Sequence, residues 1–181
     1  NEIINVLNDS NLFSEVSVKY EENKYIIFVK EFPSIDKIYF DKNERLKDED
    51  LQLIASEINL STFNTNSLNL YVNELITLYE SFGYNDVKIE YVEKFYEDIN
   101  AVDIYFKINE GKITKIKNIF IEGNNTILSQ EIKDTINSKT KSLRNIFANN
   151  NYKPAVAERD KFIISNFYKK NGFINVNVET K

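Results

Sequence analysis

The sequence predicts an α+β protein built of tandem modules, each with the element order strand, helix, helix, strand, strand. Residues 78–89 and 167–178 both read as a helix end, a glycine, an aromatic residue and a strand of alternating apolar residues. Their glycines, Gly83 and Gly172, are 89 positions apart. Two breaks, at residues 31–33 and 110–111, are each followed by a new run of β character. A fixed period of this kind is typical of repeated structural modules.

Composition limits the class of protein. With 181 residues, 42% hydrophobic and 28% charged, the chain has the make-up of one to three small folded domains. It opens without a basic and then apolar leader, and no apolar run approaches the roughly 18 residues of a membrane-spanning helix. The sequence contains no Cys, which excludes disulfides and thiolate metal sites, and no His, the commonest general base. We therefore expect a protein that is not an enzyme and needs no cofactor or metal.

Charge is distributed unevenly along the chain. Residues 1–111 hold 10 Lys and Arg against 22 Asp and Glu, whereas residues 112–181 hold 13 against 6. The net charge of −5 argues against a nucleic-acid partner. The change of sign at Gly111 coincides with an expected module boundary. It reflects either ordinary drift between solvated faces or a last module that meets acidic groups on a partner or a lipid surface.

The chain begins partway through an earlier copy of the repeated segment. Residues 12–18 match residues 83–89 in their aromatic and alternating positions, with Leu12 in the place of Gly83. A polar turn separates residues 12–18 from the apolar run 25–29. The two runs are therefore expected to pair as a hairpin that ends a first, partial module.

The complete module begins after Pro33, which lacks a backbone donor and suits the end or edge of a strand. Residues 35–40 form its first expected strand. Three acids at 48–50 head a helix that runs to about residue 58, because the unpaired N–H groups of a first helical turn favour negative charge.

A longer helix is expected over residues 66–82, ending at Gly83 as a residue with positive φ. Its apolar face is formed by Leu68, Val72, Leu75 and Tyr79. Alternating apolar residues then predict a strand at 86–93 and a return strand at 102–108.

The last module repeats these signals. An apolar strand at residues 116–121 precedes a turn at Gly123, and Ser129 is expected to cap a short helix to about residue 137. A polar insertion occupies residues 138–153. Pro154 then opens a helix that ends at Gly172, and the apolar alternation at 174–180 predicts a final strand.

These signals resemble the POTRA (polypeptide-transport-associated) domain, whose element order is β-α-α-β-β. The junction at residues 29–38 and the following residues 46–51 resemble the link between the first two such domains of outer-membrane β-barrel assembly proteins. Residues 110–111, 119–124 and 168–173 are similar to that family's second-to-third junction, first strand and second-helix end. The resemblance covers nearly the whole chain.

The resemblance implies tandem modules, each a three-stranded mixed sheet covered by two helices. It places the end of a first POTRA domain at residues 1–32, a complete second domain at 33–110, and a third at 111–181 without its last strand. It further implies a periplasmic arm at the outer membrane of a Gram-negative bacterium, preceding a C-terminal membrane β-barrel. The expected partners are unfolded outer-membrane protein clients and accessory assembly lipoproteins.

The expected binding sites are two sheet edges. The segments 86–93 and 174–180 are expected to be outer arms of hairpins, whose free backbone groups can pair with an extended client. Charges at Lys88, Glu90 and Glu93 could instead guard the first edge. The candidate binding residues are Val87, Lys88, Ile89, Glu90, Tyr91, Ile174, Asn175, Val176, Asn177 and Val178.

Three alternatives remain open at this stage. The modules could belong to a two-partner secretion transporter or a translocation-assembly factor. The chain could be a periplasmic hydrolase built on carboxylates, which would need a deep pocket with convergent acids. It could also be a spacer that binds nothing at its edges.

Overall fold

The computed structural model describes residues 2–141 and 148–180. Asn1, residues 142–147, within the expected polar insertion, and Lys181 lie outside the described residues. The chain divides into two compact units. The first contains Asn1–Thr77 and Lys88–Glu110, and the second contains Leu78–Val87 and Gly111–Lys181.

The first unit begins with a helix and a hairpin. Helix α1 (Glu2–Asp9) packs against strand β1 (Phe13–Glu21), which pairs antiparallel with β2 (Lys24–Glu31) as expected from the two apolar runs. Every residue of β2 is exposed. The hairpin is tied to the following module by the backbone oxygen of Asn11, which accepts hydrogen bonds from Thr62 Oγ1 at 3.0 Å and Asn64 Nδ2 at 3.4 Å.

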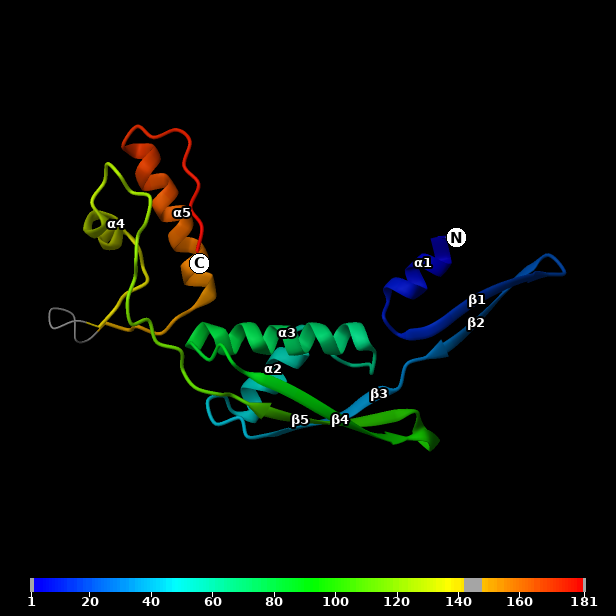
Figure 1. Ribbon diagram of the computed structural model, residues 1–181. Coiled ribbons are helices and arrows are strands. Elements are labelled where there is room, and N and C mark those ends of the chain that lie inside the picture. The colour runs from blue at the N-terminus through cyan, green and yellow to red at the C-terminus, as the bar shows by residue number, and fades with distance from the viewer. Residues whose placement is uncertain (1, 142–147, 181) are drawn as a thin grey trace. The chain divides into compact units, whose positions relative to one another are not determined.

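A three-stranded mixed sheet with two helices on one face follows the hairpin (Figure 1). It forms the rest of the first unit, except that the end of the second helix, from Leu78, is assigned to the second unit. The order along the chain is β3 (Ser34–Asp41), α2 (Asp48–Glu57), α3 (Thr65–Phe82), β4 (Lys88–Tyr96), a short 3₁₀ turn η1 (Glu97–Ile99) and β5 (Ala101–Asn109). Strand β5 lies in the centre, parallel to β3 and antiparallel to β4. The α+β class and this order agree with the expectation.

The core lies between the helices and one face of the sheet. Alternate residues of β5 face the helices and are buried, whereas Tyr105 and Lys107 between them are exposed. On α3, Tyr71 is fully buried in place of the expected Val72, and its hydroxyl donates to the Leu51 carbonyl at 2.9 Å. In the first unit, the core residues of the two helices and β5 with at most 1% exposure are Leu51, Leu68, Tyr71, Leu75, Val102, Ile104, Phe106 and Ile108.

Helix ends repeat one backbone geometry three times. The N–H of Gly83 donates to the oxygen three residues earlier, and Gly172 does the same. Both have positive φ, at 100° and 91°. In the first copy this position is taken by Asn11, with φ of 58° and the same hydrogen bond, and not by Leu12 as the sequence match suggested. Asn tolerates the left-handed region, so the motif survives without glycine.

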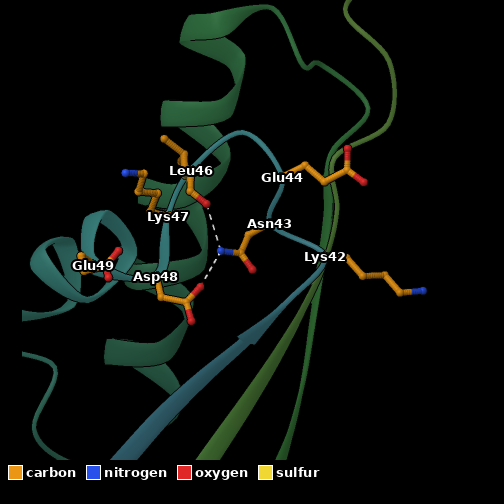
Figure 2. Close-up of a pocket in the computed structure, with 7 residues that line it drawn as sticks. All are labelled: Lys42, Asn43, Glu44, Leu46, Lys47, Asp48 and Glu49. Atoms are coloured by element: carbon orange, nitrogen blue, oxygen red, sulfur yellow. Dashed lines mark hydrogen bonds between the residues drawn. The ribbon is translucent and has the colours of Figure 1, made fainter.

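A second repeated motif precedes the first helix of each module. Asn43 Nδ2 donates to the Leu46 carbonyl at 2.9 Å and to Asp48 Oδ1 at 2.7 Å (Figure 2). In the second unit, Asn124 makes the equivalent pair of bonds, to Ile127 and Ser129. The asparagine in each module therefore closes the turn by the same hydrogen bonds.

The residue before each asparagine also has matching geometry. Gly123 has φ of 79°, and Lys42, which replaces the glycine in the other module, has φ of 65°. A left-handed conformation costs a residue with Cβ about 1 kcal/mol relative to glycine. The turn is thus conserved between the two modules despite the missing glycine.

Replacing Lys42 by glycine is therefore expected to raise the free energy of unfolding of the first unit by about 0.5–1 kcal/mol. Chemical denaturation followed by circular dichroism would measure it. The reverse substitution, Gly123→Lys, should destabilise the second unit by a similar amount. A destabilising Lys42→Gly would show that the lysine contributes a contact larger than the backbone strain.

The second unit contains helices α4 (Ser129–Thr135) and α5 (Pro154–Lys170), with Pro154 in the first turn as expected. Ser129 is not the cap. Leu128 occupies that position, and Ser129 Oγ instead accepts from Asn124. The buried carboxylate of Asp160 on α5 accepts from the backbone N–H groups of Asn137 and Ser138, at 2.7 and 2.8 Å, and so holds the end of α4.

The two strands expected in the second unit are not formed. Residues 116–121 and 174–180 make no ladder, and among the described residues of the second unit an isolated bridge joins Lys115 to Asn151. In the first unit the equivalent strands, β3 and β4, do not pair with each other, because both pair with β5 between them. The described part of the second unit supplies no such central strand, so its two apolar segments have no strand to pair with, although both backbone groups of Ile116 form hydrogen bonds with Asn150.

Within the described residues, no helix combines the length and apolar character needed to cross a membrane. Residues 2–141 and 148–180 also contain no group of three or more acids that could hold a metal ion.

Candidate strand-binding edges

Strand β4 is an edge of the sheet in the first unit. All nine of its residues are in register with β5 on one side, from Lys88 opposite Asn109 to Tyr96 opposite Ala101. On its other side, no strand of the described chain pairs with it. In an antiparallel strand, alternate residues direct their N–H and C=O groups to each side, so about half of the nine present them outward.

The opposite edge, β3, is partly covered. Ile35 N–H donates to the Ser61 oxygen at 2.9 Å, and Phe63 N–H donates to the Pro33 oxygen at 2.8 Å. The segment between α2 and α3 therefore occupies the start of this edge. Of the two edges, β4 offers the longer run of backbone without such a cover.

Side chains along β4 divide between two faces. Ile89 and Tyr91 face the helices and are half-buried, and the Tyr91 ring lies 5.6 Å from that of Phe106. Val92 on the other face is 65% exposed. Lys88, Glu90 and Glu93 are exposed, so the strand carries charges of both signs beside an apolar centre.

The far end of β4 contains a linked polar group. Tyr96 donates its hydroxyl to Asp103 Oδ2 at 2.9 Å, and Lys94 Nζ lies 5.0 Å from the Tyr96 ring centroid. The pKa of Lys94 is raised. The largest cause is its side-chain hydrogen bond with Tyr96, and the next is its electrostatic interaction with the same side chain. Phe95 packs edge-on against Phe63 within the first unit, with ring centroids 5.3 Å apart.

In the second unit an open groove lies along helix α5. It has a volume of about 1040 Å³ and is lined by both segments that fail to form strands, residues 116–123 and 175–180. Ile132, Ile164 and Tyr168 form part of its apolar lining. The groove is thus lined by the segments that correspond to β3 and β4, which are the two neighbours of β5 in the first unit.

The expected site residues are thus placed in two different environments. Lys88, Ile89, Glu90 and Tyr91 lie on the edge strand β4, and Val87 is a buried residue just before it. Residues 174–178 form no strand, and Ile174 is 85% exposed. The structure does not bring the two segments together within one unit.

The acids expected of a hydrolase do not converge at the turn shown in Figure 2. Glu44 and Glu49 lie on opposite sides of the turn, and Asp48 accepts a hydrogen bond from Asn43. Sequence reasoning missed the helix-free face of the sheet, where Tyr39 and Tyr105 stack with centroids 4.7 Å apart. The sequence signal for this face was the alternation of residues along β3 and β5.

The geometry thus defines a protein with one complete β-α-α-β-β module that has an open sheet edge, followed by a unit that repeats its turn and helix-end motifs. The chain belongs to the POTRA family: the family described as "POTRA: Surface antigen variable number repeat" matches residues 33–111 and 114–181.

Curated relatives with similar sequences include two proteins named outer membrane protein assembly factor BamA. The protein from Buchnera aphidicola is 26% identical over 175 residues, covering 93% of this chain and 28% of the relative. The one from Neorickettsia risticii is 26% identical over 184 residues, covering 99% and 24%. The chain therefore spans about a quarter of the length of these relatives.

Solved structures support the same fold. POTRA domains 3–5 of BamA from Haemophilus influenzae match with a TM-score of 0.53 at 12% identity, covering 97% of this chain and 71% of that one. BamA from Haemophilus ducreyi lacking POTRA domains 1–3 matches with a TM-score of 0.51 at 16% identity, covering 80% and 25%.

Proposed function

We propose that this chain is part of the periplasmic POTRA arm of an outer-membrane protein assembly factor, and that β4 binds extended segments of unfolded outer-membrane proteins. The family match and the names of the relatives support the first part. One observation carries the second: β4 is a nine-residue edge strand with no strand on its outer side in the described chain.

Pairing through backbone groups suits a receptor for many clients. A strand added to β4 gains its affinity from main-chain hydrogen bonds, which do not depend on the client's sequence. Its alternate side chains would lie beside Tyr91 on one face and Val92 on the other. Strands of membrane β-barrels alternate apolar and polar residues, so they place their apolar side chains on one of these faces.

The third module extends the same proposal. The boundaries 1–32, 33–110 and 111–181 describe one partial and two further modules, the last lacking its central strand. A strand in the groove beside α5 would pair with residues 116–121 on one side and with residues 174–178 on the other. We assign this strand to a further segment of a longer protein, since the relatives are about four times as long.

In such a protein, a C-terminal membrane β-barrel would follow the arm, and accessory lipoproteins would dock on it at the periplasmic face of the outer membrane. This part of the proposal is supported by the relatives, whose names state outer membrane protein assembly. The proposed role is binding and not catalysis.

Backbone-methylated peptides test the β4 edge directly. A nine-residue peptide with the alternation of a barrel strand is titrated into labelled protein, and amide NMR shifts are followed. Shifts should appear first in residues 88–96. The peptide is then prepared in two forms, N-methylated on one or the other set of alternate residues. Only the form that loses the N–H groups facing β4 should bind more than tenfold more weakly, because several hydrogen bonds of about 1 kcal/mol each are lost.

The two methylated forms have the same amino-acid sequence and serve as controls for each other. Equal binding of both forms would show that side chains and not backbone pairing hold the peptide. Shifts confined to the helices or to the groove beside α5 would contradict the assignment to β4.

A further inference from the structure

The helix-free face of the sheet in the first unit carries an ordered pattern of side chains. Cross-strand partners lie on the same face of a sheet, so the register of β3, β5 and β4 defines rows across it. We call the nine residues of three successive rows the open face. From β3 through β5 to β4, the rows are Lys37–Asp103–Lys94, Tyr39–Tyr105–Val92 and Asp41–Lys107–Glu90.

The middle row is apolar and exposed. The rings of Tyr39 and Tyr105 stack at an interplanar angle of 11° and are 41% and 38% exposed, and Val92 beside them is 65% exposed. No element of the described first unit covers this row, because α2 and α3 both lie on the other face (Figure 1).

The outer rows carry reversed charge patterns. The first row reads positive, negative, positive, and the third reads negative, positive, negative. Asp103 in the first row is only 3% exposed, and its Oδ1 accepts no hydrogen bond from the described chain. Lys37 approaches the neighbouring Asp36 at 4.0 Å, with both side chains more than half exposed. That contact is weak and leaves the lysine able to meet a further carboxylate.

These patterns make the open face complementary to itself. The relevant two-fold axis runs parallel to the sheet, along the middle row and across the strands. Rotation about it places a second copy face to face on the first, with its strands running in the opposite direction. Lys37 then faces Asp41 of the second copy, Lys94 faces Glu90, and Asp103 faces Lys107. Each of the three contacts occurs twice, as in any isologous interface, and every one joins opposite charges.

We propose that a second copy of this chain packs face to face on the open face, about such an axis. Two sheets packed in this way are about 10 Å apart, a gap that a lysine and a carboxylate from opposite sides can bridge. The apolar middle rows meet at the centre. The other axis in the plane, parallel to the strands, would set Lys37 over Lys94 and Asp41 over Glu90, and like charges make that arrangement unfavourable.

The contact is expected to be weak. Three strands of about five residues each cover on the order of 200–400 Å² per copy, well below the roughly 800 Å² of a stable interface. The association is therefore transient and needs high local concentration. The proposal is independent of client binding at β4, since it uses the face of the sheet and not its edge.

Cross-linking tests the geometry cleanly because the chain contains no Cys. Val92→Cys places one thiol close to the proposed axis, and Leu53→Cys places one on the exposed side of α2, 59% exposed. The two variants are treated with a short bis-maleimide at about 0.1–1 mM protein, a concentration suited to an interface below standard size. Val92→Cys should give at least fivefold more covalent dimer than Leu53→Cys. Equal yields would mean that the open face is only solvated, and would overturn the proposal.

Charge reversal tests the pairing itself. In the Val92→Cys background, Glu90→Lys alone or Lys94→Glu alone sets like charges opposite each other and should lower the dimer yield at least fivefold. Mixing the two variants restores opposite charges at both contacts and should recover the yield as a heterodimer. Lys24→Glu at the start of β2 has the same charge change as Lys94→Glu and should have no effect. A mixture that cross-links no better than either variant alone would refute the two-fold arrangement.

Discussion

Replacing Phe106 by alanine is expected to lower the free energy of unfolding of the first unit by about 3–5 kcal/mol. The Phe106 side chain is 1% exposed at the centre of β5. Its ring meets those of Phe40, Tyr71 and Tyr91, with centroid distances of 5.8, 5.2 and 5.6 Å. Removing it leaves a cavity between both edge strands and α3, and none of the three neighbouring rings can collapse into it without leaving the sheet or the helix.

Urea denaturation monitored by far-ultraviolet circular dichroism, with hydrogen exchange assigning the loss to the first unit, would measure this effect. Phe162→Ala is the matched control, because that ring is 68% exposed on α5, and a change within about 0.5 kcal/mol is expected. A loss below about 1.5 kcal/mol for Phe106→Ala would contradict the packing described here.

Gly83→Ala is expected to destabilise the second unit by about 2–4 kcal/mol, from backbone strain and overpacking together. The φ of 100° disfavours any residue with a Cβ. An added Cβ would also lie 2.9 Å from Asn151 Cβ and 3.2 Å from Ile113 Cγ2. These neighbours are held in place, since Asn151 Nδ2 donates to the Phe82 oxygen at 2.9 Å and Thr114 N–H donates to the Gly83 oxygen at 2.9 Å.

The repeat supplies the control. Gly172 has the same role after α5 and a φ of 91°, but a Cβ there would meet no atom within 4 Å. Gly172→Ala should therefore cost only the backbone strain, about 1–2 kcal/mol. Amide exchange at residues 113–115 and 150–152 should accelerate in Gly83→Ala and not in Gly172→Ala. Equal costs for the two substitutions would show that the close contact relaxes freely.

Local signals in the sequence determined most of the first unit. The acids at the start of α2, the apolar spacing of α3 and Gly83 after it depend on contacts within a few residues, so they could be read directly from the chain. The edge position of β4 was also expected. Its role in binding clients stays a prediction, as do the module boundaries.

Other features depended on partners that are distant in sequence. Apolar alternation at residues 116–121 and 174–180 predicted strands, but a strand forms only where another strand accepts its hydrogen bonds, and the described second unit offers none. The register that sets Lys37, Tyr39 and Asp41 beside β5 was equally hidden, because a shift of one residue would turn each side chain to the other face. The sequence by itself therefore determined which segments are helical or extended and where they end. Only the tertiary structure decided which extended segments pair and what their faces present, since pairing joins backbone groups across tens of residues and local preference cannot specify them.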